Sequence, residues 1–314
     1  MPEVLQEDLR QISNTLYSPR EQELKTRQLL RITRDYDAFA DVIGYDVYDR
    51  TGSAIVLAAG ADAKDIPFVG DNLERFTQQV YTVATGIRFT KSERDAVESR
   101  RRRAIGPAPQ LDQRRVATAR RYCFEKEHKL TFAGDSAVGI KGLFDASFYG
   151  ANKGTKEDVA EGSFGGTAAQ NRLWVNKTPQ EILDDLLQAK IVVEDGELFE
   201  SKVLVISTKA KNRLLKPYSN TSPMTTLKWL ATEGMYFNQV ITTNVMTSTY
   251  NGDSVDYFMV LDNDPEIVEL ATTQDITLLP AVFDMLQTSK QAVIMKTGGP
   301  IVRHPAAFYI GKGV

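Results

Sequence analysis

The chain has 314 residues, of which 42% are hydrophobic and 25% are charged, and its formal net charge is −3 at pH 7. This length predicts two domains, or one large domain with an insertion, and this composition is ordinary for a folded protein and argues against wholesale disorder. The net charge gives no overall signal for nucleic-acid binding. A single cysteine, Cys123, excludes an intramolecular disulfide framework and is typical of a reducing cytosol. With neither a signal-peptide pattern nor 18 consecutive apolar residues, we expect neither secretion nor membrane insertion.

Charge is distributed unevenly along the chain. Residues 91–130 hold 12 Lys or Arg against 6 Asp or Glu, whereas residues 231–290 hold one Lys against nine Asp or Glu. This asymmetry predicts two faces in different surroundings, or opposite charges that meet between subunits. The run Arg100 to Arg103 alone can be a solvated or salt-bridged helix face, or it can contact a polyanion.

The first 34 residues have the pattern of two short helices. Apolar residues recur at helical spacing in the first, at Leu5, Leu9, Ile12 and Leu16, and Ser18-Pro19-Arg20-Glu21 has the residues that start a second. An amphipathic segment of this kind outside the main fold usually packs on a neighbour, so Leu9, Ile12 and Leu16 are candidate residues of an assembly interface.

Residues 41–89 have the sequence pattern of a long β-hairpin. We expect a strand over 54–59, a polar turn over 60–65, an extended segment over 66–69 and a second strand over 78–89. Such a hairpin has little core of its own, so it either packs on its own domain or pairs with another subunit. The candidate interface residues are apolar or proline: Ile55, Leu57, Ile66, Pro67 and Phe68.

A basic helical region follows in two parts. We expect helices over 91–104 and 112–128, because Gly106-Pro107-Ala108-Pro109 must interrupt any helix. Cys123 lies on the apolar side of the second helix, so we expect it in the core. The next stretch, 132–144, combines three glycines and Asp135 with apolar residues, which predicts tight turns whose apolar side chains anchor in a core.

The remainder of the chain alternates between helices and strands. Residues 148–170 read as a polar loop, and a helix begins at Thr178-Pro179 with a capping box completed by Glu181. Strands are expected at 202–206, 239–243 and 255–261, and helices at 209–216 and 224–232. Asp264-Pro265 is expected to start a helix rather than to bind calcium, and two strands, 291–296 and 301–310, close the chain.

We find no constellation of residues that supports catalysis. Gly162 to Thr167 superficially matches a phosphate-binding loop, but no Lys follows it. Two histidines and one widely spaced cysteine do not form a zinc pattern, and Asp184-Asp185 is expected on a solvated helix face. We therefore expect no catalytic residues, no cofactor and no metal.

The basic helix running into Gly134-Asp135, followed by Gly139-Ile140-Lys141-Gly142-Leu143, resembles the junction after the spine helix of Hong Kong 97-type major capsid proteins of tailed phages. Encapsulins, the bacterial nanocompartment shells, share this pattern. The resemblance extends from about Asp35 to the C-terminus. It implies an α+β, Hong Kong 97-like capsid fold.

The resemblance also implies an organisation into five parts. These are an N-terminal arm over 1–40, a β-hairpin extension loop over 41–89, a peripheral domain with the spine helix and Gly-rich loop over 90–174, an axial α/β domain over 175–285, and C-terminal strands over 286–314 that return to the peripheral and axial domains. The N-arm and the hairpin would make contacts between subunits.

As implied by the family, the partners are other copies of the chain in pentamers and hexamers, packaged double-stranded DNA bound non-specifically, and scaffold, portal or decoration proteins, without a membrane. The location would be the virion capsid, assembled in the host cytoplasm. The residues that would face inward toward DNA are basic: Arg100, Arg101, Arg102, Arg103, Arg114 and Arg115. Two alternatives stay open, an encapsulin-type shell protein and a soluble α/β enzyme with a hairpin insertion.

Overall fold

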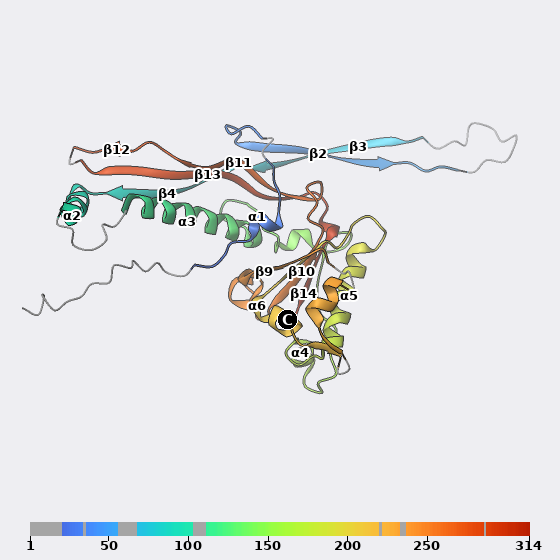
Figure 1. Cartoon of the computed structure of the whole chain (residues 1–314). Coiled ribbons are helices and arrows are strands. Elements are labelled where there is room, and N and C mark those ends of the chain that lie inside the picture. Colours follow the sequence, from blue (N-terminus) through green and yellow to red (C-terminus); the bar gives the residue numbers. More distant parts are fainter. Residues whose placement is uncertain are drawn as a thin grey trace, which may run out of the picture. The chain divides into compact units, whose positions relative to one another are not determined.

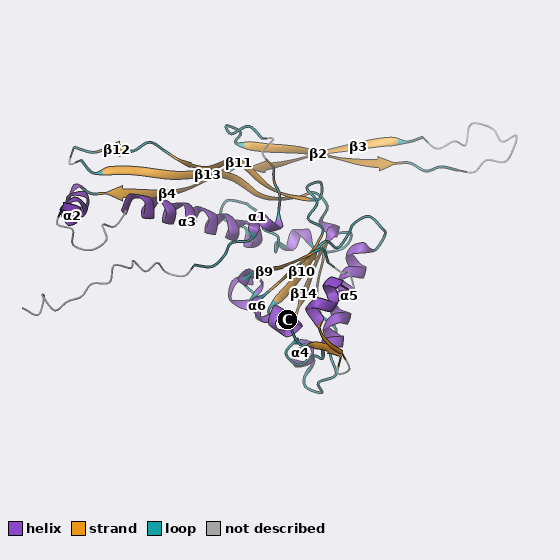
Figure 2. Cartoon of the chain, in the orientation of Figure 1, coloured by secondary structure: helices purple, strands orange, loops and turns teal. Residues whose placement is uncertain are grey.

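The computed structural model describes residues 21–33, 36–55, 68–102, 111–219, 222–232, 237–285 and 287–314, except for a few side chains within helices and strands (Figure 1). The chain forms two compact units. The first comprises residues 1–24, 82–128 and 274–296, and the second comprises residues 25–81, 129–273 and 297–314. Helices and strands occur in both units, which confirms the α+β class (Figure 2).

The first unit is built from helices and long strands. Its elements are α2 (Lys91–Arg102), most of α3 (Leu111–Ala133), most of β4 (Tyr81–Phe89), β12 (Val282–Phe283) and parts of β11 (Val268–Leu278) and β13 (Ser289–Val302). β13 pairs with β11, β12 and β4. The core between α3 and these strands contains Ile87, Phe89, Cys123 and Val293, so the expected burial of Cys123 is confirmed.

The predicted two-part helical region is confirmed, with one difference at its end. α3 continues to Ala133, five residues beyond the expected end at His128. It stops where Gly134 takes a φ of +71°, a left-handed conformation that closes a helix and favours glycine. Within the following loop a Cβ on Gly142 would lie 2.3 Å from the backbone nitrogen of Gly134, so the close approach of two backbone segments requires glycine there.

The second unit contains a five-stranded sheet in the order β5-β14-β10-β6-β9. Its strands are β5 (Thr155–Asp158), β14 (Phe308–Lys312), β10 (Tyr257–Leu261), β6 (Val203–Ile206) and β9 (Gln239–Thr242). On one face, Leu204, Ile206 and Phe258 pack with residues of α5 (Pro179–Glu194), α6 (Thr208–Leu214) and α7 (Thr226–Thr232). On the other face, Val205 and Met259 pack with Leu29 of α1 (Thr26–Leu29) and with Phe132 and Leu143, which flank the Gly-rich loop at 134–142. The central strands β6 and β10 are buried on both faces, and they read as continuous apolar runs.

The predictions made for this sheet hold best where local signals were strong. α5 begins at Pro179 with the expected capping box, in which the Thr178 hydroxyl accepts from the Glu181 backbone and the Glu181 carboxylate accepts from the Thr178 backbone. Strand β5 lies inside the segment that we expected to be a loop. The remaining short elements are η2 (Ala146–Phe148), α4 (Ala168–Arg172), β7 (Pro217–Ser219), β8 (Ser222–Thr225), η3 (Asn244–Met246), α8 (Ser248–Asn251) and η4 (Pro305–Ala307).

Three predictions near the C-terminus are wrong. No helix starts at Asp264-Pro265, because these residues form a turn that leads into β11 at Val268. The Gly298-Gly299-Pro300 stretch does not divide two strands: β13 runs through it, and Gly299 accommodates the irregularity with a φ of +82°. The last strand therefore starts later than expected, at Phe308, after the short η4 helix.

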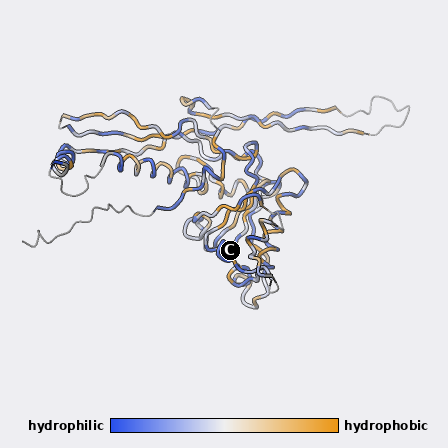
Figure 3. Tube along the Cα trace, in the orientation of Figure 1, coloured by the Kyte–Doolittle hydropathy of each residue, from blue (hydrophilic) through white to orange (hydrophobic). Residues whose placement is uncertain are grey.

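The hairpin is present, but its strands are not where the sequence placed them. β2 (Val42–Thr51) pairs antiparallel with β3 (Gly70–Gln79) over ten residue pairs. Gly52 to Ile55 is not a strand, residues 56–67 lie outside the described part, and Tyr81–Phe89 belongs to the sheet around β13. Hydrophilic and hydrophobic residues are interspersed along β2 and β3 (Figure 3), which hides the strands from a search for apolar runs.

The helix near the N-terminus differs from the one that we expected. Residues 21–25 are not helical, and α1 spans only Thr26–Leu29, so the second expected helix is shorter and later than predicted. Leu9, Ile12 and Leu16 lie outside the described residues. Ile32–Thr33 forms β1, which pairs parallel with β11.

Candidate assembly surfaces

The β2–β3 hairpin presents side chains on two faces with little cover. Alternation along the strands places Tyr45 and Phe76 on one face, where their rings stack at 5.5 Å. The opposite face carries Tyr48 and Leu73, which pair across the strands and are 54% and 62% exposed. This face of the hairpin is therefore a candidate assembly surface.

Charged pairs fix the register of the hairpin without a core. Arg75 donates two hydrogen bonds to Asp46 directly opposite, at 2.6 and 2.8 Å, and the Tyr48 hydroxyl donates to Asp71 at 2.6 Å. The Arg75 guanidinium lowers the pKa of Asp46. Charges along both strands also discourage uncontrolled pairing of exposed edges.

Two of the five predicted hairpin interface residues are described. Ile55 and Phe68 are 46% and 92% exposed, as an interface residue of an isolated subunit must be. Leu57, Ile66 and Pro67 lie outside the described residues. Tyr48, Leu73 and Phe76 are also exposed, and the sequence did not predict them as candidate interface residues because they lie among polar and charged residues rather than in an apolar run. The sequence signal that identifies such residues is the period of two.

The base of the hairpin is tied to the segment around β1 by a buried carboxylate. Glu269 accepts hydrogen bonds from the Thr33 hydroxyl and, at 2.6 Å, from the Tyr36 hydroxyl, and it pairs with Arg303. The Arg303 guanidinium in turn lies 5.5 Å from the ring centre of Tyr45 in β2. Burial, followed by the hydrogen bond to Glu269, raises the pKa of Tyr36 to about 12.

Three of the six predicted inward-facing arginines have described side chains, and two of these three form ion pairs. Arg115 pairs with Glu93 at 2.6 Å and lies 5.0 Å from the ring centre of Phe89, and it lowers the pKa of Glu93 to about 2. Arg102 pairs with Glu98 one helical turn away, at 3.2 Å, and stays exposed. Arg114 is half-buried. The side chains of Arg100 and Arg101 are not described, and Arg103 lies outside the described residues.

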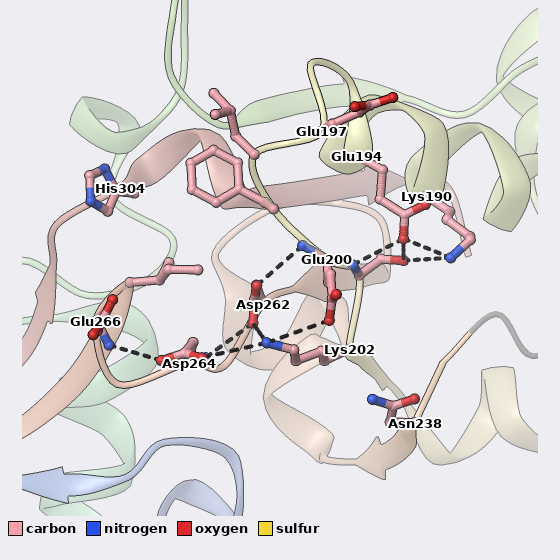
Figure 4. A pocket seen from close by; sticks show the side chains of 14 residues that line it. Lys190, Glu194, Glu197, Glu200, Lys202, Asn238, Asp262, Asp264, Glu266 and His304 are labelled. Atoms are coloured by element: carbon pink, nitrogen blue, oxygen red, sulfur yellow. Dashed lines mark hydrogen bonds and ion pairs between the residues drawn. The ribbon is translucent and has the colours of Figure 1, made fainter.

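A pocket of about 900 Å³ lies near the start of β6 and is lined mainly by charged side chains (Figure 4). Lys202 at its centre pairs with Asp262 at 3.0 Å, Asp264 at 3.5 Å and Glu200 at 3.8 Å. The hydrogen bond to Asp262 raises the pKa of Lys202, so the ammonium is held charged. An ion network of this kind positions the strand ends, and it leaves Asp262 already bonded to the Glu200 backbone rather than free to act on a substrate.

One predicted solvated carboxylate is buried instead. Asp185 is 5% exposed, accepts from Lys177 Nζ at 2.5 Å and from Trp174 Nε1 at 2.9 Å, and lies on the side of α5 that packs on the sheet. The neighbouring Asp184 is exposed, as expected. Adjacent helix positions point apart, but the sequence does not show which of the two faces inward. Burial raises the pKa of Asp185 despite its partner Lys177.

Two kinds of site are not found in the described part of the chain. Its His, Cys, Asp and Glu side chains form no group of three placed to hold a metal ion. Among its helices, none is both long and apolar enough to cross a membrane.

A two-part basic helix, an extended hairpin and an α/β unit define a Hong Kong 97-like capsid protein, and solved structures share this fold. The capsid of Myoviridae Phage XM1 matches with a TM-score of 0.77 at 14% identity, covering 99% of each chain. Mycobacterium phage Bobi matches with a TM-score of 0.64 at 12% identity, covering 96% of this chain and 94% of that one. The virus-like particle from Pyrococcus furiosus matches with a TM-score of 0.54 at 15% identity, covering 91% of each chain.

The family model for major capsid proteins matches residues 54–314. The chain therefore belongs to the major capsid protein family, and it is a structural protein of the phage head that assembles with copies of itself into a multi-subunit shell. No curated protein matches it.

Proposed function

We propose that copies of this chain form pentamers and hexamers that close into an icosahedral head around double-stranded DNA, with assembly in the cytoplasm of the bacterial host. The role is structural rather than catalytic, which membership of the major capsid protein family supports. Scaffold, portal and decoration proteins are further partners. The proposed subunit has five parts. They are an N-arm over 1–40, an extension loop over 41–89, a peripheral domain over 90–174, an axial domain over 175–285 and C-terminal strands over 286–314.

The observation that carries this proposal is the uncovered β2–β3 hairpin. Ten paired residues span about 33 Å, and a two-stranded ribbon of this length is marginal in water by itself. Docking of the Tyr48 and Leu73 face on a neighbouring subunit would bury two large side chains that are exposed in the single chain. Many such modest contacts, each weak alone, hold a closed shell together.

The first experiment is expression of the full chain by itself, with negative-stain microscopy and size-exclusion chromatography. Closed shells, or separate five- and six-fold clusters, support the proposal. A monodisperse small oligomer under all conditions, including with the scaffold protein of the same phage, would contradict it.

The hairpin contact has a matched pair of variants. L73D places a charge on the Tyr48 face, whereas N72D places the same charge on the opposite face of the same strand. Because burial of an unpaired carboxylate is costly, we expect L73D to raise the concentration needed for assembly by about tenfold or more and N72D to leave it near the wild-type value. Equal behaviour of the two variants would show that this face does not dock.

The basic region is proposed to lower the electrostatic cost of packing DNA, without reading its sequence. We expect replacement of Arg100, Arg101, Arg102 and Arg103 by Gln to leave shells intact in micrographs and to reduce the DNA they retain. Loss of assembly itself would instead place these arginines in a subunit contact.

A further inference from the structure

A basic flank lies on one side of the sheet in the second unit. Residues 203–232 hold five Lys or Arg and no Asp or Glu. Four of them are lysines in or next to α6 and α7, which contact each other. These four, which we call the basic flank, are Lys209, Lys211, Lys216 and Lys228.

The lysines of the basic flank form no ion pairs within the part of the chain that the structure describes. Three of them are exposed and Lys211 is half-buried. Two other lysines that follow the Gly-rich loop are paired: Lys177 with Asp185 at 2.5 Å and Lys190 with Glu194 at 2.7 Å. Four like charges on and beside two contacting helices give this surface a positive potential, which favours an approaching negative charge.

The opposite edge of the same sheet is acidic. Strand β5 forms that edge and carries Glu157 and Asp158, which line a pocket of about 440 Å³ together with Glu161 and Asp184. We call these four residues the acidic flank. Arg172 pairs with Asp158 at 2.7 Å and Glu161 at 3.5 Å, whereas Asp184 is exposed and has no ion pair with a described residue.

The sheet holds the two charges apart. β5 and β9 are its two edges, separated by four strand spacings or about 19 Å. The basic flank belongs to the helices between β6 and β9, and in Figure 1 α6 lies on the β9 side whereas α5, which carries Asp184, lies on the β14 side. Within one copy, no ion pair joins the two flanks among the described residues.

We propose that the basic flank of one copy docks on the acidic flank of the next copy around a ring. A head-to-tail contact in a closed ring uses two different surfaces of the same chain, and here two surfaces of opposite charge lie at opposite edges of one sheet. Charge complementarity then fixes the direction of the ring and rejects a reversed neighbour. DNA would need the basic flank alone, so the acidic flank favours a second copy as the partner. This inference rests on the proposed pentamers and hexamers.

Two charge-reversal variants test the contact. K209E/K216E/K228E makes both flanks acidic, and E157K/E161K/D184K makes both flanks basic. Each variant alone meets like charge at every contact, so we expect the concentration needed for ring or shell formation to rise about tenfold or more. As a control, K91E/K129E/K290E changes the net charge equally at exposed lysines outside the basic flank and should assemble like the wild type.

Mixing the two variants gives the sharper result. In an equimolar mixture, alternating copies restore opposite charge at every contact, so six-fold rings should return. Five-fold rings should not, because an odd number of positions cannot alternate. Microscopy of the mixture, with circular dichroism of each variant as a check on folding, measures both effects.

Each contrary outcome overturns the proposal. Normal assembly of K209E/K216E/K228E would remove the basic flank from the contact, and normal assembly with less retained DNA would assign it to nucleic acid. Failure of two folded variants to assemble when mixed would exclude the acidic flank as the partner. A wild-type chain that forms neither rings nor shells, even with its scaffold protein, would overturn the proposed function and this contact with it.

Discussion

The buried pair of Asp185 and Lys177 offers a quantitative test of how the α5 helix is held on its sheet. D185A removes a carboxylate that accepts from Lys177 Nζ at 2.5 Å and from Trp174 Nε1 at 2.9 Å, and the Lys177 side chain is only 1% exposed. The ammonium would be left without a partner in the interior, and the Trp174 N–H would lose its acceptor. Breaking a buried pair in this way costs about 3–5 kcal/mol, a large share of the 5–15 kcal/mol typical of a whole protein.

The assay is urea unfolding followed by tryptophan fluorescence. The chain has two tryptophans, so a W229F background leaves Trp174, at the pair itself, as the only reporter. With a slope of about 1–3 kcal/mol per molar urea, D185A should lower the midpoint by more than about 1 M. D184A, which removes the exposed neighbour, should change stability by less than about 0.5 kcal/mol.

A second variant separates loss of the pair from loss of packing. K177M/D185L removes both charges, and since apolar replacements of a buried ion pair are often neutral, it should recover most of the stability lost in D185A. The remaining deficit would be the unpaired Trp174 N–H, about 1–3 kcal/mol. Equal midpoints for D185A and D184A would refute the reasoning.

Two further predictions concern the Gly-rich loop and the cap of α5. G142A would place a Cβ 2.3 Å from the Gly134 nitrogen and 2.4 Å from the Phe132 carbonyl oxygen, so it should cost at least about 1–3 kcal/mol in urea unfolding, whereas G86A, with no atom within 4 Å, should cost far less; matching midpoints would contradict this. The Thr178 backbone N–H, as the largest cause, lowers the pKa of Glu181 to about 2. Stabilisation by this carboxylate is therefore present above its unfolded pKa of about 4.3 and lost as pH falls toward 2. Between pH 5 and 3 the wild type should lose more stability than E181Q, which keeps the cap without the charge, and parallel loss in both would count against this assignment.

Local rules predicted the parts of this fold that carry their own signals. The capping box of Thr178 and Glu181 places the start of α5 at the right residue, and the two helices that we expected on either side of the Gly-Pro run are α2 and α3. Continuous apolar runs located β6 and β10 because both strands are covered on both faces. In each case a few adjacent residues decide the structure.

Other features depend on partners far apart in the chain. The alternating, charged strands β2 and β3 are recognised only when Asp46 is set opposite Arg75. Burial of Asp185 depends on which side of α5 meets the sheet, and Lys177 and Trp174 supply its partners from outside the helix. The turn at Asp264 replaced an expected helix because Asp262 and Asp264 pair with Lys202 across the sheet end. None of these three sets of contacts can be predicted from a short stretch of sequence.

The carboxylate of Glu269 connects the segment around Tyr36 to Arg303 and to the start of β2. Thr33 and Tyr36 bond to it from the segment that leads into the hairpin, while Arg303 bonds to it from the C-terminal segment and lies against Tyr45 of the hairpin itself. Movement of the segment around Tyr36 therefore acts on Glu269. The same carboxylate orients Arg303, which lies against Tyr45 in β2. A displacement of Tyr36 is therefore linked to the start of β2 through the side chains of Glu269 and Arg303.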